Sequence, residues 1–239
     1  MMVHMGNFLF HWRNLLFPSL FISIFLTPWV VTADPKAELL MNIAGWATAI
    51  AGQAIRAATI GLAYIRRGGK NRRVYAEDLV TEGIFAHSRN PLYLGNLLIV
   101  LGAGLVANSL FFILAGLPFF LFAYLAIIMA EEDYLGRKFG RPYQEYCRDV
   151  PRLIPRLSGI GRTFAGMSFN WRRVMLKDYG TAFEWITGLA LLDMKDGYLT
   201  FGHLIQEGRN PSLILLVGIA AIFFLTARIL KKTRLVRAG

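Results

Sequence analysis

Residues 92–130 decide the fold class, and they read LYLGNLLIVLGAGLVANSLFFILAGLPFFLFAYLAIIMA. Two apolar runs, from Leu92 to Val106 and from Leu110 to Ala130, are separated by little more than Asn108 and Ser109. An apolar run of about 20 residues is long enough to cross the hydrocarbon core of a bilayer as a helix. The two runs therefore predict a tight hairpin of two membrane helices.

Similar runs lie on both sides of this hairpin. Two precede it, at about Leu15 to Val31 and Leu39 to Ile65, and one follows, at about Pro211 to Leu230. The stretch from Thr181 to Leu192 is also apolar, but it is too short to span a bilayer alone and is typical of a re-entrant or interfacial segment. We therefore predict an all-α polytopic membrane protein with about six transmembrane or re-entrant helices.

The composition agrees with a membrane protein. Hydrophobic residues make up 55% of the 239 residues and charged residues 17%, whereas soluble domains contain about 45–50% apolar and about 25% charged residues. So apolar a chain is not intrinsically disordered. The net charge of +11 would also suit a nucleic-acid-binding protein, but the long apolar runs argue against that class, and we predict no nucleic-acid partner.

The positive charge is unevenly distributed. Most of the 26 Lys and Arg residues fall on one side of the predicted bundle, provided that residues 181–205 cross the membrane. Basic residues accumulate in cytoplasmic loops, so this side and both termini are predicted to be cytoplasmic, with anionic membrane lipid as a partner. The basic stretch 156–177 is either an amphipathic helix lying on that lipid or a plain linker. For the first run, a signal peptide ending near Val31-Thr32-Ala33 is the alternative.

Polar residues concentrate in two segments that flank the hairpin. In the first, the run from Arg89 to Tyr93 should begin the third span, because Pro91 suits a first helical turn and disfavours helix at Asn90. The backbone N–H groups at such a start favour an anionic group. The second segment begins with Glu131-Glu132-Asp133 at the end of a span, where acids require a cationic partner. Together the segments suit a ligand that carries both charges and an apolar ring.

Two motifs in this order carry a family resemblance. Residues 79–96 read LVTEGIFAHSRNPLYLGN, and residues 131–155 read EEDYLGRKFGRPYQEYCRDVPRLIP. Over about residues 52–155 the chain resembles the superfamily of isoprenylcysteine carboxyl methyltransferases and phospholipid methyltransferases. The resemblance implies an integral membrane enzyme that uses S-adenosylmethionine as its cofactor.

The resemblance also implies a set of cofactor-binding positions, with two departures from the family pattern. The His of the family's cofactor turn is Asn90 here, which still donates a hydrogen bond but does not titrate near neutral pH. The Arg that orients the carboxylate substrate of the isoprenylcysteine enzymes is replaced by Ile127, which argues against a prenylcysteine substrate. The implied cofactor-binding residues are Asp78, Leu79, Val80, Phe85, Arg89, Asn90, Pro91, Leu92, Tyr93 and Glu131.

The candidates for catalytic roles are Arg56, His87, Tyr93 and Glu132. Methyl transfer from a sulfonium is an in-line displacement that depends largely on positioning. A carboxylate nucleophile needs no base, whereas an amine must lose a proton, for which His87, Glu132 and Tyr93 are the nearest acceptors. Arg56 interrupts the second span, and it either lines the substrate pocket or pairs with an acid.

We predict a membrane-embedded methyltransferase that moves a methyl group from S-adenosylmethionine to a lipid or lipidated small-molecule substrate at the cytoplasmic face. Residues 1–38 would form an N-terminal helix and outer loop, 39–155 the catalytic core, and 156–239 a basic interfacial segment with C-terminal membrane helices. An NADPH-dependent membrane steroid or sterol-type reductase and a non-catalytic membrane scaffold are the rival predictions. One cysteine, Cys147, and four scattered histidines predict neither a disulfide nor a metal site.

Overall fold

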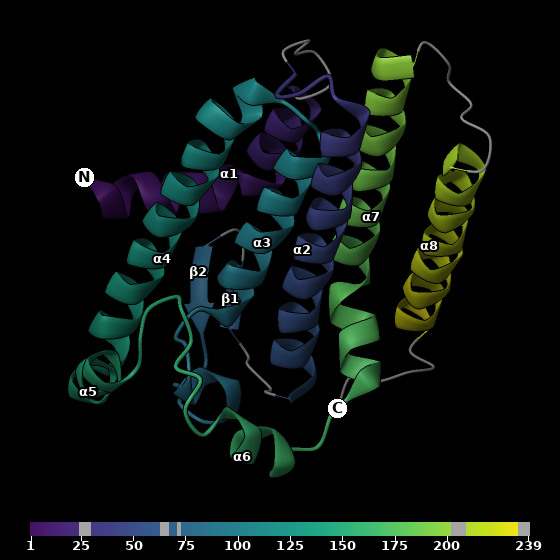
Figure 1. Cartoon of the computed structure of the whole chain (residues 1–239). Coiled ribbons are helices and arrows are strands. Elements are labelled where there is room, and N and C mark those ends of the chain that lie inside the picture. The colour runs from purple at the N-terminus through teal and green to yellow at the C-terminus, as the bar shows by residue number, and fades with distance from the viewer. Residues whose placement is uncertain (24–29, 63–66, 71–72, 202–208, 234–239) are drawn as a thin grey trace.

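The computed structural model describes residues 1–23, 30–62, 67–70, 73–201 and 209–233, which form a bundle of helices (Figure 1). Its long helices are α1 (Met2–Ser23), α2 (Pro35–Leu62), α3 (Pro91–Val106), α4 (Leu117–Phe139), α7 (Trp171–Phe201) and α8 (Arg209–Lys232). Its short ones are the 3-10 helix η2 (Gly83–Ala86), the π-helical turn η3 (Phe112–Gly116), α5 (Arg141–Asp149) and α6 (Ile160–Ala165). The predicted helical class is confirmed. One addition is an antiparallel pair of strands, β1 (Arg67–Lys70) and β2 (Arg73–Ala76).

Two helical stretches, Phe112–Phe139 and Pro211–Lys232, are long and apolar enough to cross a membrane, judged by length and composition. They coincide with the predicted fourth and last spans, and α3 is an apolar helix of shorter length. The count of six crossings and the side of the termini stay predictions. The predicted first span, 15–31, and the crossing by 181–205 lie partly outside the described residues.

The turn of the predicted hairpin is built on Asn108, whose φ is 46°. This left-handed conformation is uncommon for residues other than glycine, and asparagine tolerates it better than most. The Asn108 side chain accepts hydrogen bonds from the backbone N–H groups of Val31 and Thr32, both at 3.2 Å, and donates one to the Thr32 carbonyl at 2.8 Å. The turn therefore closes the hairpin and also fixes the segment that leads into α2.

Helices α2 and α3 lie side by side (Figure 1) and approach each other through glycine. A Cβ atom on Gly52 would lie 2.5 Å from the Gly95 carbonyl oxygen, and one on Gly102 would lie 2.5 Å from the Gly45 carbonyl oxygen. No side chain fits in such a space, so the two backbones come as close as glycine permits. This close crossing brings Arg56, one turn beyond Gly52, against α3.

The apolar stretch 181–192 is the middle of α7, a helix of 31 residues, rather than a short segment of its own. At 1.5 Å per residue, α7 is about 46 Å long. Its Trp185, Leu189 and Leu192 are buried in the main hydrophobic core with residues of α2, α3 and α4. Helix α8 packs beside α7 (Figure 1), with the ring of Phe224 lying 4.9 Å from that of Phe183.

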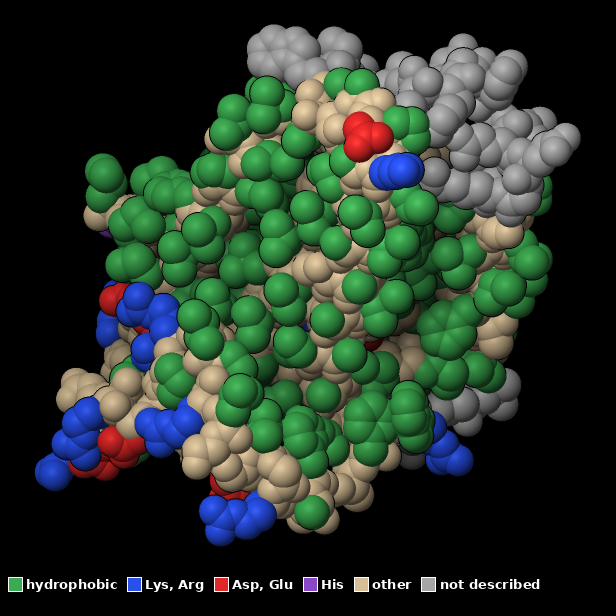
Figure 2. All heavy atoms as spheres, in the orientation of Figure 1, with side chains coloured by type: hydrophobic (Ala, Val, Ile, Leu, Met, Phe, Trp, Pro, Cys, Tyr) green, Lys and Arg blue, Asp and Glu red, His purple; other side chains and the backbone are tan. Residues whose placement is uncertain are grey.

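The basic stretch 156–177 is an ordered connection, neither one amphipathic helix nor a plain linker. It consists of the non-helical residues 156–159, α6, the non-helical residues 166–170 and the first turns of α7. Gly159, with φ of 78°, precedes α6 and interrupts the helix on that side. In the space-filling view, charged side chains gather near the end where α5 and α6 lie, and hydrophobic side chains cover the middle of this face (Figure 2). This one-sided charge agrees with the predicted asymmetry of the sequence.

Candidate active site

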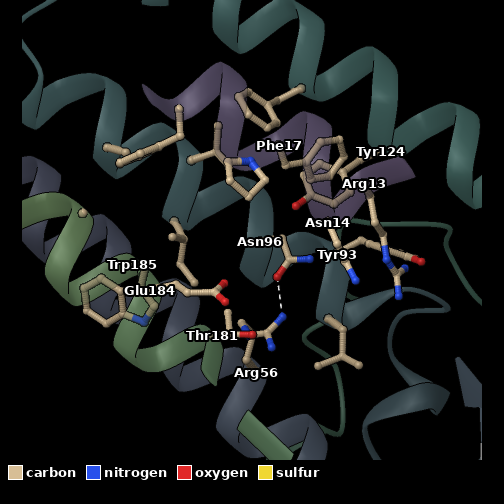
Figure 3. A pocket seen from close by; sticks show the side chains of 18 of the residues that line it. Arg13, Asn14, Phe17, Arg56, Tyr93, Asn96, Tyr124, Thr181, Glu184 and Trp185 are labelled. Atoms are coloured by element: carbon tan, nitrogen blue, oxygen red, sulfur yellow. Dashed lines mark hydrogen bonds between the residues drawn. The ribbon is translucent and has the colours of Figure 1, made fainter. Parts of the chain in front are cut away.

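A cavity of about 890 Å³ lies between α1, α2, η2, α3, α4 and α7 (Figure 3). Ligand pockets have volumes of about 300–1,000 Å³ and are mostly apolar with a few convergent polar groups. This cavity fits that description, because aromatic rings make up much of its wall. The aromatic lining residues are Phe17, Phe21, Phe85, Tyr93, Phe120, Tyr124, Phe183 and Trp185.

The first turn of α3 forms one end of the cavity. Asn90 is the N-cap of α3 and Pro91 its first residue, as the sequence predicts. The Asn90 side chain is 3% exposed and donates a hydrogen bond to the Arg152 carbonyl at 2.9 Å. Ser88 Oγ donates to the Leu153 carbonyl, also at 2.9 Å. The segment that follows α5 therefore holds this turn in place. Asn90, Pro91, Leu92 and Tyr93 all line the cavity.

Glu131 supplies a buried carboxylate to the cavity wall. It lies on α4, is 4% exposed, and accepts a hydrogen bond from the Tyr93 hydroxyl at 2.7 Å. The Tyr93 ring in turn lies 5.6 Å from that of Tyr124, a neighbour from α4. A carboxylate in an apolar surrounding is costly unless it is hydrogen-bonded or faces a positive charge. The geometry at Glu131 therefore suits a cationic ligand.

Glu132 faces away from the cavity. Consecutive residues of an α-helix point about 100° apart, and Glu132 is directed toward the segments that flank α3 and follow α5. Its carboxylate forms ion pairs with Arg89 at 3.0 Å and with Arg152 at 2.8 Å. The hydrogen bond with Glu132 raises the pKa of Arg152. Neither Glu132 nor Arg89 lines the cavity, and the two together hold the surrounding segments to one another.

Arg56 lines the cavity and also pairs with an acid, and its role toward a substrate stays a prediction. Its guanidinium donates to Asn96 on α3 and to the buried Asp178 on α7. Asp178 accepts a further hydrogen bond from the Gln53 amide at 2.7 Å. Gln53 in turn accepts one from the Trp185 indole N–H at 2.8 Å. A chain of polar contacts therefore connects α2, α3 and α7 along one wall of the cavity.

His87 lies outside the cavity and is used in other contacts. Its Nδ1 lies 2.8 Å from the Arg156 carbonyl oxygen and its Nε2 lies 2.8 Å from Thr163 Oγ1. A carbonyl oxygen can only accept, so Nδ1 carries a proton and donates it to Arg156. The side chain is 5% exposed. These contacts fix the connection 156–163 to the segment before α3.

The predicted Asp78–Val80 segment does not line the cavity. Asp78 is exposed, and Leu79 packs against the cluster of Leu135, Tyr143 and Tyr146 below α4. Val80 packs against Ile84 and Phe85, and Phe85 itself reaches the cavity. In this structure Leu79 and Val80 therefore support the wall rather than form it.

The sequence prediction missed the contribution of α1 and α7. Arg13, Asn14 and Phe17 reach the cavity from α1. From α7, one face contributes Arg173, Lys177, Thr181, Glu184, Gly188 and Leu191. The polar members of this face recur every three or four residues, which is the period of one helix face. That spacing was the available signal, although it does not indicate which helix the face meets.

The structure shows no candidate metal site within the described ranges, since no three His, Cys, Asp or Glu side chains there lie close enough together to hold an ion. The absence of a metal stays a prediction.

Comparison with known proteins matches residues 40–142 to a family model described as phospholipid methyltransferase. The chain is 39% identical to a cobalt-zinc-cadmium resistance protein of Cupriavidus metallidurans over 80 residues, which cover 34% of this chain and 37% of that protein. Over 81 residues, 32% of this chain and 33% of the relative, it is 38% identical to a protein-S-isoprenylcysteine O-methyltransferase of Schizosaccharomyces pombe. Over 95 residues, 39% of this chain and 35% of the relative, it is 34% identical to methanethiol S-methyltransferase 2 of Bradyrhizobium diazoefficiens.

The chain thus spans 33–37% of the length of these three relatives. No solved structure matches it significantly. The matched segment contains most of α2 and all of α3 and α4. It therefore includes the first turn of α3 and Glu131, the parts of the cavity that lie in the two sequence motifs. Residues 40–142 of this chain are therefore similar to the phospholipid methyltransferase family, which lies within the superfamily that those motifs resemble.

Proposed function

We propose that this protein transfers a methyl group from S-adenosylmethionine to a lipid or lipidated small molecule at the cytoplasmic face of a membrane. The observation that carries this proposal is the Glu131–Tyr93 pair at the first turn of α3, inside a large aromatic cavity. The pair lies in the segment that matches the methyltransferase family. The methyltransferase names of two relatives support the same reaction class.

The residues present fit this cofactor. A sulfonium and an ammonium need a carboxylate, which the buried Glu131 provides. An adenine ring needs aromatic or apolar walls, which Phe85 and Tyr93 supply. The Asn90 to Tyr93 turn places the start of α3 at the cavity, where the positive end of the helix dipole favours a carboxylate. When bound, the cofactor would supply an electrophilic methyl group, and the protein would contribute mainly the alignment of the acceptor.

The acceptor would enter sideways between α1 and α7. Asn14, Pro18 and Ile22 recur every four residues on α1, line the cavity, and are exposed. Glu184 and Leu191 on α7 also line the cavity and are exposed. The cavity therefore opens between these two helices, and α1 also exposes the apolar side chains of Phe8, Trp12 and Leu15. A lipid could reach it from the bilayer without leaving the hydrocarbon region.

The orientation of the protein belongs to the same proposal. The basic end that carries α5 and α6 would face the cytoplasm and its anionic lipid, together with both termini. Residues from each of the three predicted segments, 1–38, 39–155 and 156–239, line the cavity. If the predicted boundaries at 38 and 155 hold, all three segments would contribute to one active site.

The test uses the full chain in nanodiscs of total membrane lipid, incubated with S-adenosylmethionine labelled in the methyl group. We expect label in the lipid fraction, less of it with Glu131→Gln, and an unchanged amount with Glu145→Gln, which alters an exposed carboxylate on α5. Release of the label by alkali indicates a carboxyl ester, and a stable label indicates methylation at nitrogen, oxygen or carbon.

Two results would contradict the proposal. One is the absence of calorimetric binding of S-adenosylmethionine and S-adenosylhomocysteine to the wild type. The other is oxidation of NADPH with reduction of an enone lipid in place of methyl transfer, which would support the reductase. Normal cofactor binding without label in any lipid would instead support the non-catalytic scaffold.

A further inference from the structure

Glu184 is the second carboxylate that lines the cavity, and it lies outside the family segment. It is located on α7, beside Trp185, and Figure 3 shows its carboxylate directed into the cavity from the wall opposite Tyr93 and Arg13. Glu131, the other lining carboxylate, is already engaged by Tyr93. For Glu184, the described part of the chain offers no hydrogen bond and no ion pair.

The cationic side chains that line the cavity together with Glu184 are Arg13, Arg56, Arg173 and Lys177. Arg56 is the one that acts electrostatically on Glu184, but its guanidinium is bound to Asp178 and Asn96. Arg56 and Asp178 together carry no net charge, so this pair does not balance the carboxylate of Glu184. Lys177 precedes Glu184 by seven residues on α7, which corresponds to about 10 Å along the helix axis.

Glu184 is exposed at the open side of the cavity, next to a largely apolar part of α7. Its neighbours Trp185 and Leu189 belong to the main hydrophobic core, and Leu191 lies one to two turns further along the same face. Ionisable residues in a membrane helix are expensive and are therefore functional candidates by default. Glu184 also lies at the open side between α1 and α7, where an acceptor lipid would first meet a charged group.

We propose that Glu184 determines acceptor specificity by holding a cationic amine, and that it disfavours acceptors with a carboxylate head group. This inference rests on the proposed function and deepens it, since it decides between the two nucleophile classes that the sequence leaves open. A carboxylate and an ammonium form a charge-assisted hydrogen bond. For methyl transfer the held ammonium would first lose one proton to water at the open side of the cavity. The nitrogen lone pair would then bond to the methyl carbon as the bond from that carbon to the sulfonium sulfur breaks, which would leave the methylated amine and S-adenosylhomocysteine. Two carboxylates at the same place repel each other, and both terminal nitrogens of Arg56 are already bound, to Asn96 and Asp178.

The test compares two acceptors of equal chain length, hexadecylamine and hexadecanoic acid, with the full chain in nanodiscs and labelled S-adenosylmethionine. We expect the wild type to methylate the amine in preference to the acid. Glu184→Gln should raise the KM for the amine about tenfold, leave kcat nearly unchanged, and not impair the acid. Glu184→Asp should retain part of the preference, and Glu145→Gln should retain all of it.

Binding of S-adenosylhomocysteine, measured by calorimetry, separates this inference from the proposed function. We expect wild type and Glu184→Gln to bind it equally. If the wild type does not bind it, the proposed function is wrong and this inference falls with it. If both bind it, three results overturn the role of Glu184 alone. One is that the wild type prefers the acid as acceptor, and another is that it methylates neither lipid. The third result is that Glu184→Gln loses methylation of both acceptors equally.

Discussion

Glu131 and Glu132 are adjacent on α4, yet their substitution by glutamine should affect different properties. Glu131→Gln should weaken cofactor binding, whereas Glu132→Gln should lower stability. Glu131 lies in the cavity with the Tyr93 hydroxyl at 2.7 Å. Glu132 lies outside it, between Arg89 and Arg152. Glutamine keeps the size of each side chain and its ability to accept a hydrogen bond. The two variants therefore isolate the effect of one negative charge on either side of the same helix.

The expected magnitudes follow from these contacts. Hydrogen bonds to charged groups contribute about 1.5–3 kcal/mol, which corresponds to a weakening of cofactor binding by about 10- to 150-fold in Glu131→Gln. The side chain of Glu132 is 14% exposed but that of Arg152 is 47% exposed, so solvent screens part of this pair. We expect Glu132→Gln to lower the free energy of unfolding by about 1–2 kcal/mol and to change cofactor affinity by less than about threefold.

The assay is calorimetric titration of both variants and the wild type with S-adenosylhomocysteine, together with thermal unfolding in the same detergent. Glu145→Gln serves as the control, because its carboxylate is exposed and pairs with Arg141 on the same short helix. Equal Kd changes in Glu131→Gln and Glu132→Gln would refute the assignment of Glu131 to the cavity. A loss of stability in Glu131→Gln that matches its loss of affinity would refute it as well.

Three further predictions concern the scaffold. Gly52→Ala should lower the free energy of unfolding by about 1–3 kcal/mol, because the new Cβ would lie 2.5 Å from a carbonyl oxygen of α3. Gly218→Ala on α8 is the control, since nothing lies within 4 Å of a Cβ there. Equal denaturation midpoints for the two variants would contradict the prediction. Asp178→Leu should destabilise the fold by about 3 kcal/mol by leaving Arg56 without its carboxylate. The double variant with Arg56→Met should recover most of that loss in the same unfolding assay, and a purely additive loss would contradict the pairing. Burial raises the pKa of Tyr143 above its ordinary value near 10. The contribution of the protonated Tyr143 to stability should therefore be fully present below about pH 10 and be lost as the pH rises further. Tyr143→Phe should remove this loss of stability at alkaline pH, as measured by unfolding at a series of pH values.

Much of the fold could be predicted because it is encoded locally. The run from Leu92 to Ala130 contains two helices and a turn, and the structure places α3, the Asn108 turn and α4 there. The structure also starts α3 at Pro91, as expected from the restricted φ of proline. Helix α7 was predicted less well, because its polar residues interrupt the hydropathy of a single continuous helix.

The candidate site was predictable in part. Asn90 to Tyr93, Phe85, Arg56 and Glu131 reach one cavity, since local motifs place them at the starts and ends of neighbouring helices. His87 and Glu132 have the right chemistry, but their contacts are with Thr163 and Arg152, far along the chain. No local pattern shows which side of a helix will face a cavity, so these two could not be separated from the lining residues in advance.

The sequence by itself determined that the chain is a helical membrane-type protein, where its hairpin lies, and which family motifs it carries, because hydropathy and backbone restrictions act over a few residues. The tertiary structure decided which charges share a space. It brought Glu184 and Asp178 of α7 to the wall that contains Arg56, and it turned Glu131 inward and Glu132 outward. The physical reason is that the close glycine crossing of α2 and α3 and the packing of α7 against them set these distances, and no single segment contains that information.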